Sequence, residues 1–345
     1  MIEVKNLSKY YGQKLAVNNI SFSIKKGEIV GFLGPNGAGK STTMNIITGY
    51  LSASSGSVTV SGYDILKNPD ECKKRIGYLP EFPPLYPDMT VREYLEFVFD
   101  LKCSKSKLKK DEHINRVVAL VRINHVEKRL IRNLSKGYKQ RVGIAQALIG
   151  DPDILILDEP TVGLDPKQII EVRNVIKELG KEKTIILSSH ILQEIDSVCE
   201  KIIIINNGVL MADGSPDKIS DMLSSKEEFT LTVSGDREKA DSILTNEIEN
   251  VSEVKFIKET PQGLMYSVVS DFEKDARENV FFALAKGNLP ITSMKSSSLT
   301  LEEIFLKLTG ENAVPLVKEI PVPKNENKSI METFCDILGI KKEEK

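Results

Sequence analysis

The spacing of apolar residues divides residues 1–220 into strands, a helical stretch, and then strands that alternate with helices. Ile20-Ser21-Phe22-Ser23-Ile24 alternates apolar and polar residues, which is typical of a half-buried strand. Residues 29–33 are continuously apolar and indicate a strand buried on both faces. Between Thr90 and Ala147, apolar residues recur at helical spacing. We therefore expect a β-rich start, to about residue 66, followed by a helical insert.

The remainder of this first region returns to short apolar runs separated by amphipathic helices. Residues 154–157, 184–187 and 202–205 are buried-strand patterns, and residues 167–179 form an amphipathic helix pattern. Strands that alternate with helices predict a parallel sheet with helical crossovers.

A change of pattern near Ser220 predicts a second domain. From residue 228 to residue 310 the order is strand, helix, strand, strand, helix, strand, helix, which indicates a small α+β domain with a ferredoxin-like arrangement as a candidate. Residues 311–345 contain three prolines and a polar run, so we expect a linker and tail. Residues 329–340 within it fit either a disordered tail or a short amphipathic helix that binds a partner.

Composition limits the classes of protein that fit this pattern. The chain has 345 residues, of which 41% are hydrophobic, and its formal net charge is −2. That length suits about two domains, and the balanced charge gives no reason to expect nucleic acid as a partner. The N-terminus shows no signal peptide. No apolar run approaches the ~18 residues that suggest a membrane span. We expect a cytoplasmic chain that can still act at a membrane through a partner.

A glycine-rich loop supplies the first candidate chemistry. Residues 34–41 read Gly-Pro-Asn-Gly-Ala-Gly-Lys-Ser, which fits the phosphate-loop pattern between a buried strand and a helix. Its backbone amides and the helix N-terminus attract phosphate oxygens. Lys40 would reach the β- and γ-phosphates, and the Ser41 hydroxyl would bind Mg²⁺. The expected nucleotide-binding residues of the loop are Gly34, Pro35, Asn36, Gly37, Ala38, Gly39, Lys40, Ser41 and Thr42.

The loop alone does not separate ATPases, GTPases and small-molecule kinases. Asp158 and Glu159, which end the buried strand pattern at 154–157, add a second acidic site that would lie beside the loop. Asp158 can hold Mg²⁺ through water, and Glu159 is placed to polarise an attacking water as a general base. The alternative is that the two acids only cap the end of a strand.

Residues 1–220 as a whole resemble the nucleotide-binding subunits of ABC transporters, with every family motif in order. Tyr11 stands where the family places an aromatic ring that stacks on adenine. Residues 133–138, Asn-Leu-Ser-Lys-Gly-Tyr, resemble the family signature Leu-Ser-Gly-Gly-Gln. Gly163-Leu164-Asp165 resembles the D-loop, and His190 follows Ser188-Ser189 as the switch histidine does.

The resemblance implies a fold and a mechanism. The fold is an α/β P-loop NTPase cassette over residues 1–220. It has a mixed sheet, an antiparallel β subdomain and a helical subdomain at about 82–147, and a small α+β C-terminal domain follows at 221–310. Two cassettes would meet head to tail, as a homodimer or a heterodimer, around ATP and Mg²⁺. The signature residues Ser135, Lys136, Gly137 and Tyr138 would then serve the ATP of the partner cassette. Glu159 and His190 would act in catalysis, and Asp165 would couple the two sites.

The chain departs from the family pattern in two motifs. Glu81 stands where the family has the glutamine of the Q-loop; it keeps an oxygen for Mg²⁺ but adds a charge. In the signature, Lys136 replaces a glycine and Tyr138 replaces a glutamine, whereas Ser135 and Gly137 are retained. We expect Mg²⁺ ligands at Ser41, Asp158 and Glu81.

The subtype suggested by the resemblance is an exporter. Residues 298–310 resemble the C-terminal extension of ABC-2 type export ATPases, and Pro80-Glu81 resembles their gliding-motility and copper-associated branches. The loop at 82–87 leads into the insert with which the family docks on integral membrane permease subunits, although its apolar residues also fit ordinary packing. The chain would thus lie at the inner face of the cell membrane.

We therefore expect an ATPase that drives export through a separate membrane subunit. One alternative is a soluble ABC-type ATPase that acts on ribosomes or DNA, although such proteins usually carry two cassettes or long coiled-coil inserts. Another is a phosphotransferase, which would have no use for a signature that acts on a partner's nucleotide.

Overall fold

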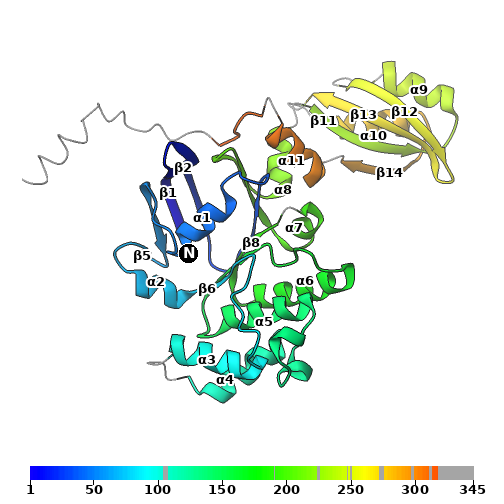
Figure 1. Cartoon of the computed structure of the whole chain (residues 1–345). Coiled ribbons are helices and arrows are strands. Elements are labelled where there is room, and N and C mark those ends of the chain that lie inside the picture. The colour runs from blue at the N-terminus through cyan, green and yellow to red at the C-terminus, as the bar shows by residue number, and fades with distance from the viewer. Residues whose placement is uncertain are drawn as a thin grey trace, which may run out of the picture.

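The structure is a computed structural model that describes residues 1–103, 108–189, 191–223, 226–246, 248, 251–271, 276–296, 299–310 and 313–317. Within these residues the chain forms one large body with two sheets and one small domain with a third (Figure 1). The expected tail helix at 329–340 lies outside the described residues, as does His190.

The first sheet of the large body is the expected β-rich start. Its strands are β1 (Ile2–Tyr11), β2 (Lys14–Ile24), β4 (Ser55–Val60) and β5 (Tyr63–Asp64). They pair antiparallel in the order β2-β1-β4-β5. This sheet buries one face, with Ile20, Phe22 and Ile24 of β2 alternating into a shared core as the alternating sequence pattern predicts.

The second sheet is mixed and carries the crossovers. Its strands are β3 (Ile29–Leu33), β6 (Ile76–Leu79), β7 (Ile154–Asp158), β8 (Thr184–Ser188), β9 (Lys201–Asn206) and β10 (Val209–Gly214). The order is β10-β9-β3-β8-β7-β6, parallel throughout except for β10, which pairs antiparallel with β9. The carboxyl ends of the parallel strands therefore share one edge, where ligands bind in such sheets.

Helices fill the connections of the large body. They are α1 (Lys40–Ile47), α2 (Pro69–Arg75), α3 (Val91–Cys103), α4 (Lys110–Leu120), α5 (Lys136–Leu148), α6 (Pro166–Gly180), α7 (Leu192–Val198) and α8 (Pro216–Leu223), with short 3-10 turns η1 (Asn124–Val126) and η2 (Ile131–Asn133). The helical insert is formed by α3, α4 and α5 (Figure 1).

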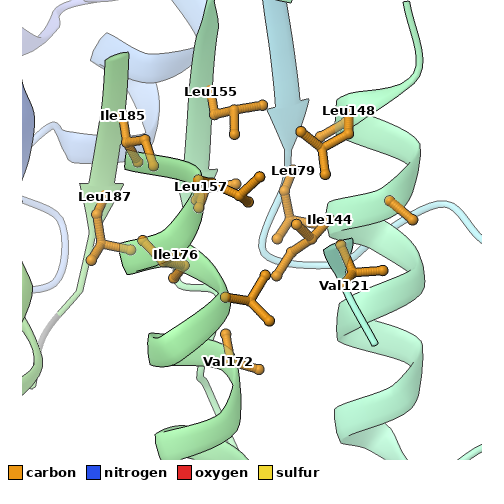
Figure 2. Close-up of a cluster of buried hydrophobic side chains, with 14 of the residues drawn as sticks. Leu79, Val121, Ile144, Leu148, Leu155, Leu157, Val172, Ile176, Ile185 and Leu187 are labelled. Atoms are coloured by element: carbon orange, nitrogen blue, oxygen red, sulfur yellow. The ribbon is translucent and has the colours of Figure 1, made fainter. Parts of the chain in front are cut away.

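A continuous apolar core joins this insert to the sheet. Figure 2 shows leucines and isoleucines of β6, β7 and β8 pointing toward Ile144 and Leu148 of α5 and toward Val172 and Ile176 of α6. Burial of each such side chain contributes about 1.5–3 kcal/mol relative to exposure. Helices α5 and α6 are therefore fixed on the strands whose ends carry the candidate site.

The small domain has the ferredoxin-like arrangement that the sequence order suggested. Its elements are β11 (Lys226–Val233), α9 (Arg237–Asn246), β12 (Val251–Thr260), β13 (Gly263–Asp271), α10 (Arg277–Lys286) and β14 (Ile291–Ser296). The strands pair antiparallel in the order β12-β13-β11-β14. The domain has its own apolar core around Phe229, Leu231 and Tyr266.

After the small domain the chain returns to the large body. Helix α11 (Leu301–Thr309) begins with a capping box between Thr300 and Glu303, and it packs against α7, α8 and β9. Its Leu301, Ile304 and Leu308 belong to the large core, although the sequence pattern alone grouped this helix with the small domain. Along the sequence, the small domain is thus inserted between α8 and α11, which lie side by side in Figure 1.

Within the ranges given above, none of the helices is both long enough and apolar enough to cross a bilayer.

Candidate functional site

The phosphate loop connects β3 to the N-terminus of α1. Gly39 is the N-cap of α1 with φ 108°, a conformation that favours glycine. A Cβ atom at this position would lie 2.7 Å from the carbonyl oxygen of Ala16, so a larger residue would displace the loop. The helix start has no side-chain cap. Its first amides therefore remain available to a phosphate, as the sequence predicts.

Lys40 is held inside this loop. Its Nζ donates hydrogen bonds to the carbonyl oxygens of Gly34 (2.8 Å) and Pro35 (3.2 Å), and the residue is 7% exposed. Burial lowers the pKa of the ammonium from its ordinary value, and the charges of Glu159, Asp158 and Glu81 oppose that shift. The loop, the lysine and three carboxylates thus form one electrostatic unit.

A pocket of about 510 Å³ opens over this unit, within the size range of small-molecule sites. It is lined by Tyr11, Lys14, Ala16, Asn36, Gly37, Gly39, Lys40, Ser41, Thr42, Glu81, Glu159 and Val162. The pocket therefore brings together residues that the sequence places far apart, from β1, the phosphate loop, the end of β6 and the end of β7. Tyr11 is 49% exposed at its rim, as a ring that stacks on a base requires.

Three lining residues, Lys14, Ala16 and Val162, were missed by the sequence analysis. Lys14 is the register partner of Tyr11 across the turn between β1 and β2. A pairing prediction for that hairpin would have placed Lys14 beside Tyr11. The pattern of residues 14–16 alone carries no comparable signal.

The two acids lie at the end of β7, which is separated from β3 by β8. Asp158 is 3% exposed and accepts a hydrogen bond from the Ser188 hydroxyl at the end of β8. Glu159 has φ 48°, which is rare for a residue other than glycine, and its amide donates to Ser188 Oγ at 2.9 Å. A strained backbone held by neighbouring hydrogen bonds is a common property of functional positions.

The signature residues lie outside the pocket, at the start of α5. Ser135 is the N-cap, and its Oγ accepts a long hydrogen bond of 3.4 Å from the Tyr138 amide. Ser135 and Lys136 are exposed, and none of the four signature residues lines the pocket. Gly137 is buried against α6, where a Cβ atom would come 2.5 Å from Gln168 Oε1. A larger residue at this position would therefore displace the Gln168 side chain.

The two departures in the signature have identifiable contacts. The Tyr138 hydroxyl lies 2.8 Å from His125 Nε2, and the Arg141 guanidinium lies 5.4 Å from the centroid of the Tyr138 ring. Arg141 also pairs with Glu171 of α6. The Lys136 side chain lies directly against Gly163 of the D-loop. The signature and the D-loop of one chain are therefore in contact with each other.

Asp165 has a local role as well as the role suggested by the resemblance. It is the N-cap of α6, and its Oδ1 accepts a hydrogen bond of 2.9 Å from the Gln168 amide. The residue is exposed. Of the expected site residues, only His190 lies outside the described part of the chain.

The mixed sheet, the phosphate loop at a helix N-terminus and the acids at the end of β7 define a P-loop nucleoside triphosphatase. The family model described as "ABC transporter" matches residues 17–162. A linearmycin resistance ATP-binding protein, LnrL, of Bacillus subtilis is 34% identical over 314 residues, which cover 90% of this chain and 98% of that protein. The chain belongs to the ATP-binding subunits of ABC transporters.

Other relatives agree with this assignment. A bacitracin transport ATP-binding protein, BcrA, of Bacillus licheniformis is 34% identical over 316 residues, covering 91% of this chain and 99% of that protein. The ATP-binding subunit of an ABC transporter superposes with a TM-score of 0.58 at 32% identity, covering 64% of this chain and 91% of the other. A dimeric, post-hydrolysis cassette, MJ0796, bound to ADP and Pi gives a TM-score of 0.57 at 27% identity, covering 62% and 98%.

These findings confirm the predicted family, fold class and ATPase activity. ATP-binding subunits of this kind dimerise and work with membrane permeases. None of the findings supports the alternative of an ATPase that acts on ribosomes or DNA.

Proposed function

We propose that this ATPase powers export through a separate integral membrane subunit, and that it does so by closing a head-to-tail dimer around ATP. The relatives named above act in linearmycin resistance and bacitracin transport, and the likeness extends over their whole length. These relatives support export as the direction of transport.

The main support for a head-to-tail dimer is that the expected site residues fall into two separate groups. The pocket holds the phosphate loop and Glu159, whereas Ser135 and Lys136 are exposed at a different surface of the same chain. A hydroxyl and the amides of a helix N-terminus are well suited to stabilise charge on a transferred phosphoryl group. A second cassette, identical or homologous, would bring such a helix start to the open pocket.

Within that dimer each residue has a distinct task. Tyr11 stacks on adenine, and Lys40 with the amides of residues 34–42 binds the phosphates. Glu159 polarises the attacking water, and its position beside the phosphate loop in the pocket supports this role. Ser135 and Gly137 of the partner complete the γ-phosphate site, with Lys136 and Tyr138 flanking them. Asp165 couples the two sites, and His190 bonds the γ-phosphate.

Mg²⁺ would be held by Ser41 and Glu81, which line the pocket, and by Asp158, whose charge acts on Lys40. These oxygen ligands fit a hard cation. Among the described residues, no group of three or more His, Cys, Asp or Glu forms a complete metal site. The ion would therefore arrive with the phosphates, which it would neutralise for hydrolysis.

The membrane subunit would dock at the loop of residues 82–87. Phe82 is 79% exposed in this loop, whereas Tyr86 packs edge-on against Tyr94 and Phe97 of α3. Tyr86 thus fixes the loop on α3, while the Phe82 ring stays exposed and is suited to a protein contact. This contact would hold the chain at the inner face of the cell membrane.

We also propose the domain division given by the sequence pattern: a cassette at 1–220 with a helical subdomain at about 82–147, a C-terminal domain at 221–310, and a linker and tail at 311–345. The packing of α11 on α7 and α8 gives the C-terminal domain a second attachment to the cassette.

ATP-driven dimerisation is tested by sedimentation velocity on the chain with Glu159→Gln, which blocks turnover. We expect a monomer without nucleotide, a dimer with ATP and Mg²⁺, and a monomer with ADP. A monomer that binds ATP to saturation without dimerising would contradict the proposal for a homodimer.

The membrane partner is tested by purifying the tagged chain from detergent-extracted membranes. We expect an integral membrane protein with several apolar spans of ~20 residues to co-purify. Phe82→Ser should reduce its recovery without changing ATP binding. Equal recovery with Phe82→Ser would place the docking surface elsewhere.

A further inference from the structure

A buried carboxylate lies behind the pocket, in a position that the site described above does not use. Glu194 on α7 is 3% exposed and does not line the pocket. Its Oε2 accepts hydrogen bonds from the hydroxyls of Thr161 and Ser189, which are 4% and 0% exposed. One carboxylate thus joins two buried hydroxyls, and the three side chains come from three separate segments.

The two partners of Glu194 belong to segments that matter for hydrolysis. Thr161 lies two residues after Glu159, at the start of the turn that leads to Asp165. Ser189 follows β8, and its Oγ also accepts a hydrogen bond of 3.0 Å from the Ile191 amide. Glu194 therefore connects the segment after the proposed general base with the residue that follows β8.

A second serine extends this connection to the acids themselves. Ser188 donates to Asp158 and accepts from the Glu159 amide, while the adjacent Ser189 donates to Glu194. Two consecutive hydroxyls, at the end of β8 and directly after it, therefore bond the acids and Glu194 respectively. Through them the strained backbone of Glu159 is linked to α7.

Stability alone does not account for a carboxylate at this place. A buried charge is costly unless it is fully hydrogen-bonded, and an apolar side chain of similar volume is often no less stable. The second oxygen of Glu194, Oε1, is buried without a hydrogen-bond partner among the described residues. Hydrogen bonds to a charged acceptor do fix geometry, because they are short and directional.

We propose that Glu194 is a positioning residue for ATP hydrolysis. It holds the 159–165 segment and Ser189, after the end of β8, in one relative geometry, and it acts through Thr161 and Ser189 without touching the nucleotide. The inference rests on the proposed role of Glu159 as general base, since the geometry that Glu194 fixes matters through that residue.

The test compares Glu194→Ala and Glu194→Gln with Asp196→Ala, which removes an exposed carboxylate from the same helix. Since small displacements of reacting groups can cost about 10²-fold in rate, we expect Glu194→Ala to lower kcat by about that factor. Equilibrium binding of ATP and KM should stay near the wild-type values. Glu194→Gln should recover most of kcat, because its amide oxygen still accepts hydrogen bonds from the hydroxyls. Asp196→Ala should behave as wild type.

Two results would overturn the inference. One is a wild-type kcat in Glu194→Ala; the other is a loss of ATP binding and Tm in proportion to kcat, which would indicate a purely structural residue. If Glu194→Ala does not fold, Thr161→Val removes one of the two hydroxyl donors instead. It should then lower kcat at unchanged KM, and an unchanged kcat would contradict the inference.

The proposal for Glu159 is checked separately. Wild-type turnover in Glu159→Gln would reject the general base, whatever Glu194→Ala does. An inactive Glu159→Gln beside a fully active Glu194→Ala would reject only the positioning role.

Discussion

The nucleotide pocket and the signature surface carry related chemistry but are built in opposite ways. At the pocket, three charged groups are buried: Lys40, Asp158 and Glu159 are 7%, 3% and 8% exposed, and the charges of the two acids act on Lys40. At the signature surface, Ser135, Lys136 and Asp165 are exposed, and Ser135 and Asp165 cap their own helices. One half of the site is assembled within the chain, and the other half is presented at its surface.

The difference follows from the cost of burying polar groups. Buried charges need their partners in the folded chain, because an unpaired one would be too costly. The exposed caps form hydrogen bonds to water and to their own helices. The signature surface is therefore stable in a single chain, before a second chain binds. The hydrogen bond that Ser135 Oγ accepts from the Tyr138 amide is 3.4 Å long, and the hydroxyl proton can still be donated to a phosphate oxygen.

The largest effect on kcat should come from Glu159→Gln in the pocket. Loss of a general base typically lowers the rate by 10²–10⁴-fold, so we expect kcat for ATP to fall by about 10³-fold. ATP binding should persist, because the substitution keeps the shape and removes a negative charge near the phosphates. Steady-state phosphate release and equilibrium ATP binding measure the two effects. Turnover at the wild-type rate would show that the water is activated elsewhere.

The second largest effect on kcat should come from Ser135→Ala at the signature surface. Removal of one donor to a developing charge costs about 10²–10³-fold, so we expect kcat to fall about 10²-fold while binding of ATP to a single chain is unchanged. The control is Thr300→Ala, which removes the N-cap of α11 far from the pocket lining. Both substitutions remove a cap, worth about 1 kcal/mol, but only the first should affect hydrolysis. Equal kcat in both variants would remove Ser135 from the composite site.

The sequence predicted the residues of the pocket better than the residues that hold them in place. The glycine pattern, the acids after an apolar strand and the motif order identified residues that the pocket brings together, because these motifs combine fixed spacing with one chemistry. Glu194 has no such signal: one glutamate in a short helix resembles any surface acid, and only the fold shows that Thr161 and Ser189 meet it. Likewise, the spacing of Leu301, Ile304 and Leu308 predicts an amphipathic helix but not which core receives it.

Tyr11 tests the open rim of the pocket. Stacking of a base on an aromatic ring is worth about 1–3 kcal/mol, so we expect Tyr11→Ala to raise KM for ATP about tenfold with little change in kcat. Tyr10→Ala is a matched control, because the neighbouring ring is equally exposed, at 50% against 49%, but does not line the pocket. Steady-state kinetics give KM and kcat for ATP in both variants. Equal KM values would mean that the adenine lies elsewhere.

The smallest effect should come from Glu81→Gln, which restores the family's usual residue. Glu81 lines the pocket, and its charge acts on Lys40, so the substitution removes one negative charge beside the proposed Mg²⁺. A partly screened unit charge near a cation is worth about 1 kcal/mol, so we expect the Mg²⁺ concentration for half-maximal activity to rise about fivefold.

A Mg²⁺ titration at fixed ATP measures the change at Glu81. Glu182→Gln is the control, since Glu182 is exposed at the turn before β8 begins, whereas the pocket lies at the opposite ends of the strands. If Glu81→Gln left both the Mg²⁺ dependence and kcat at their wild-type values, Glu81 would not sense the metal. Glu81 would then serve only to balance the charge of the buried Lys40. Asp158 and Glu159 alone would supply the acidic chemistry at the pocket.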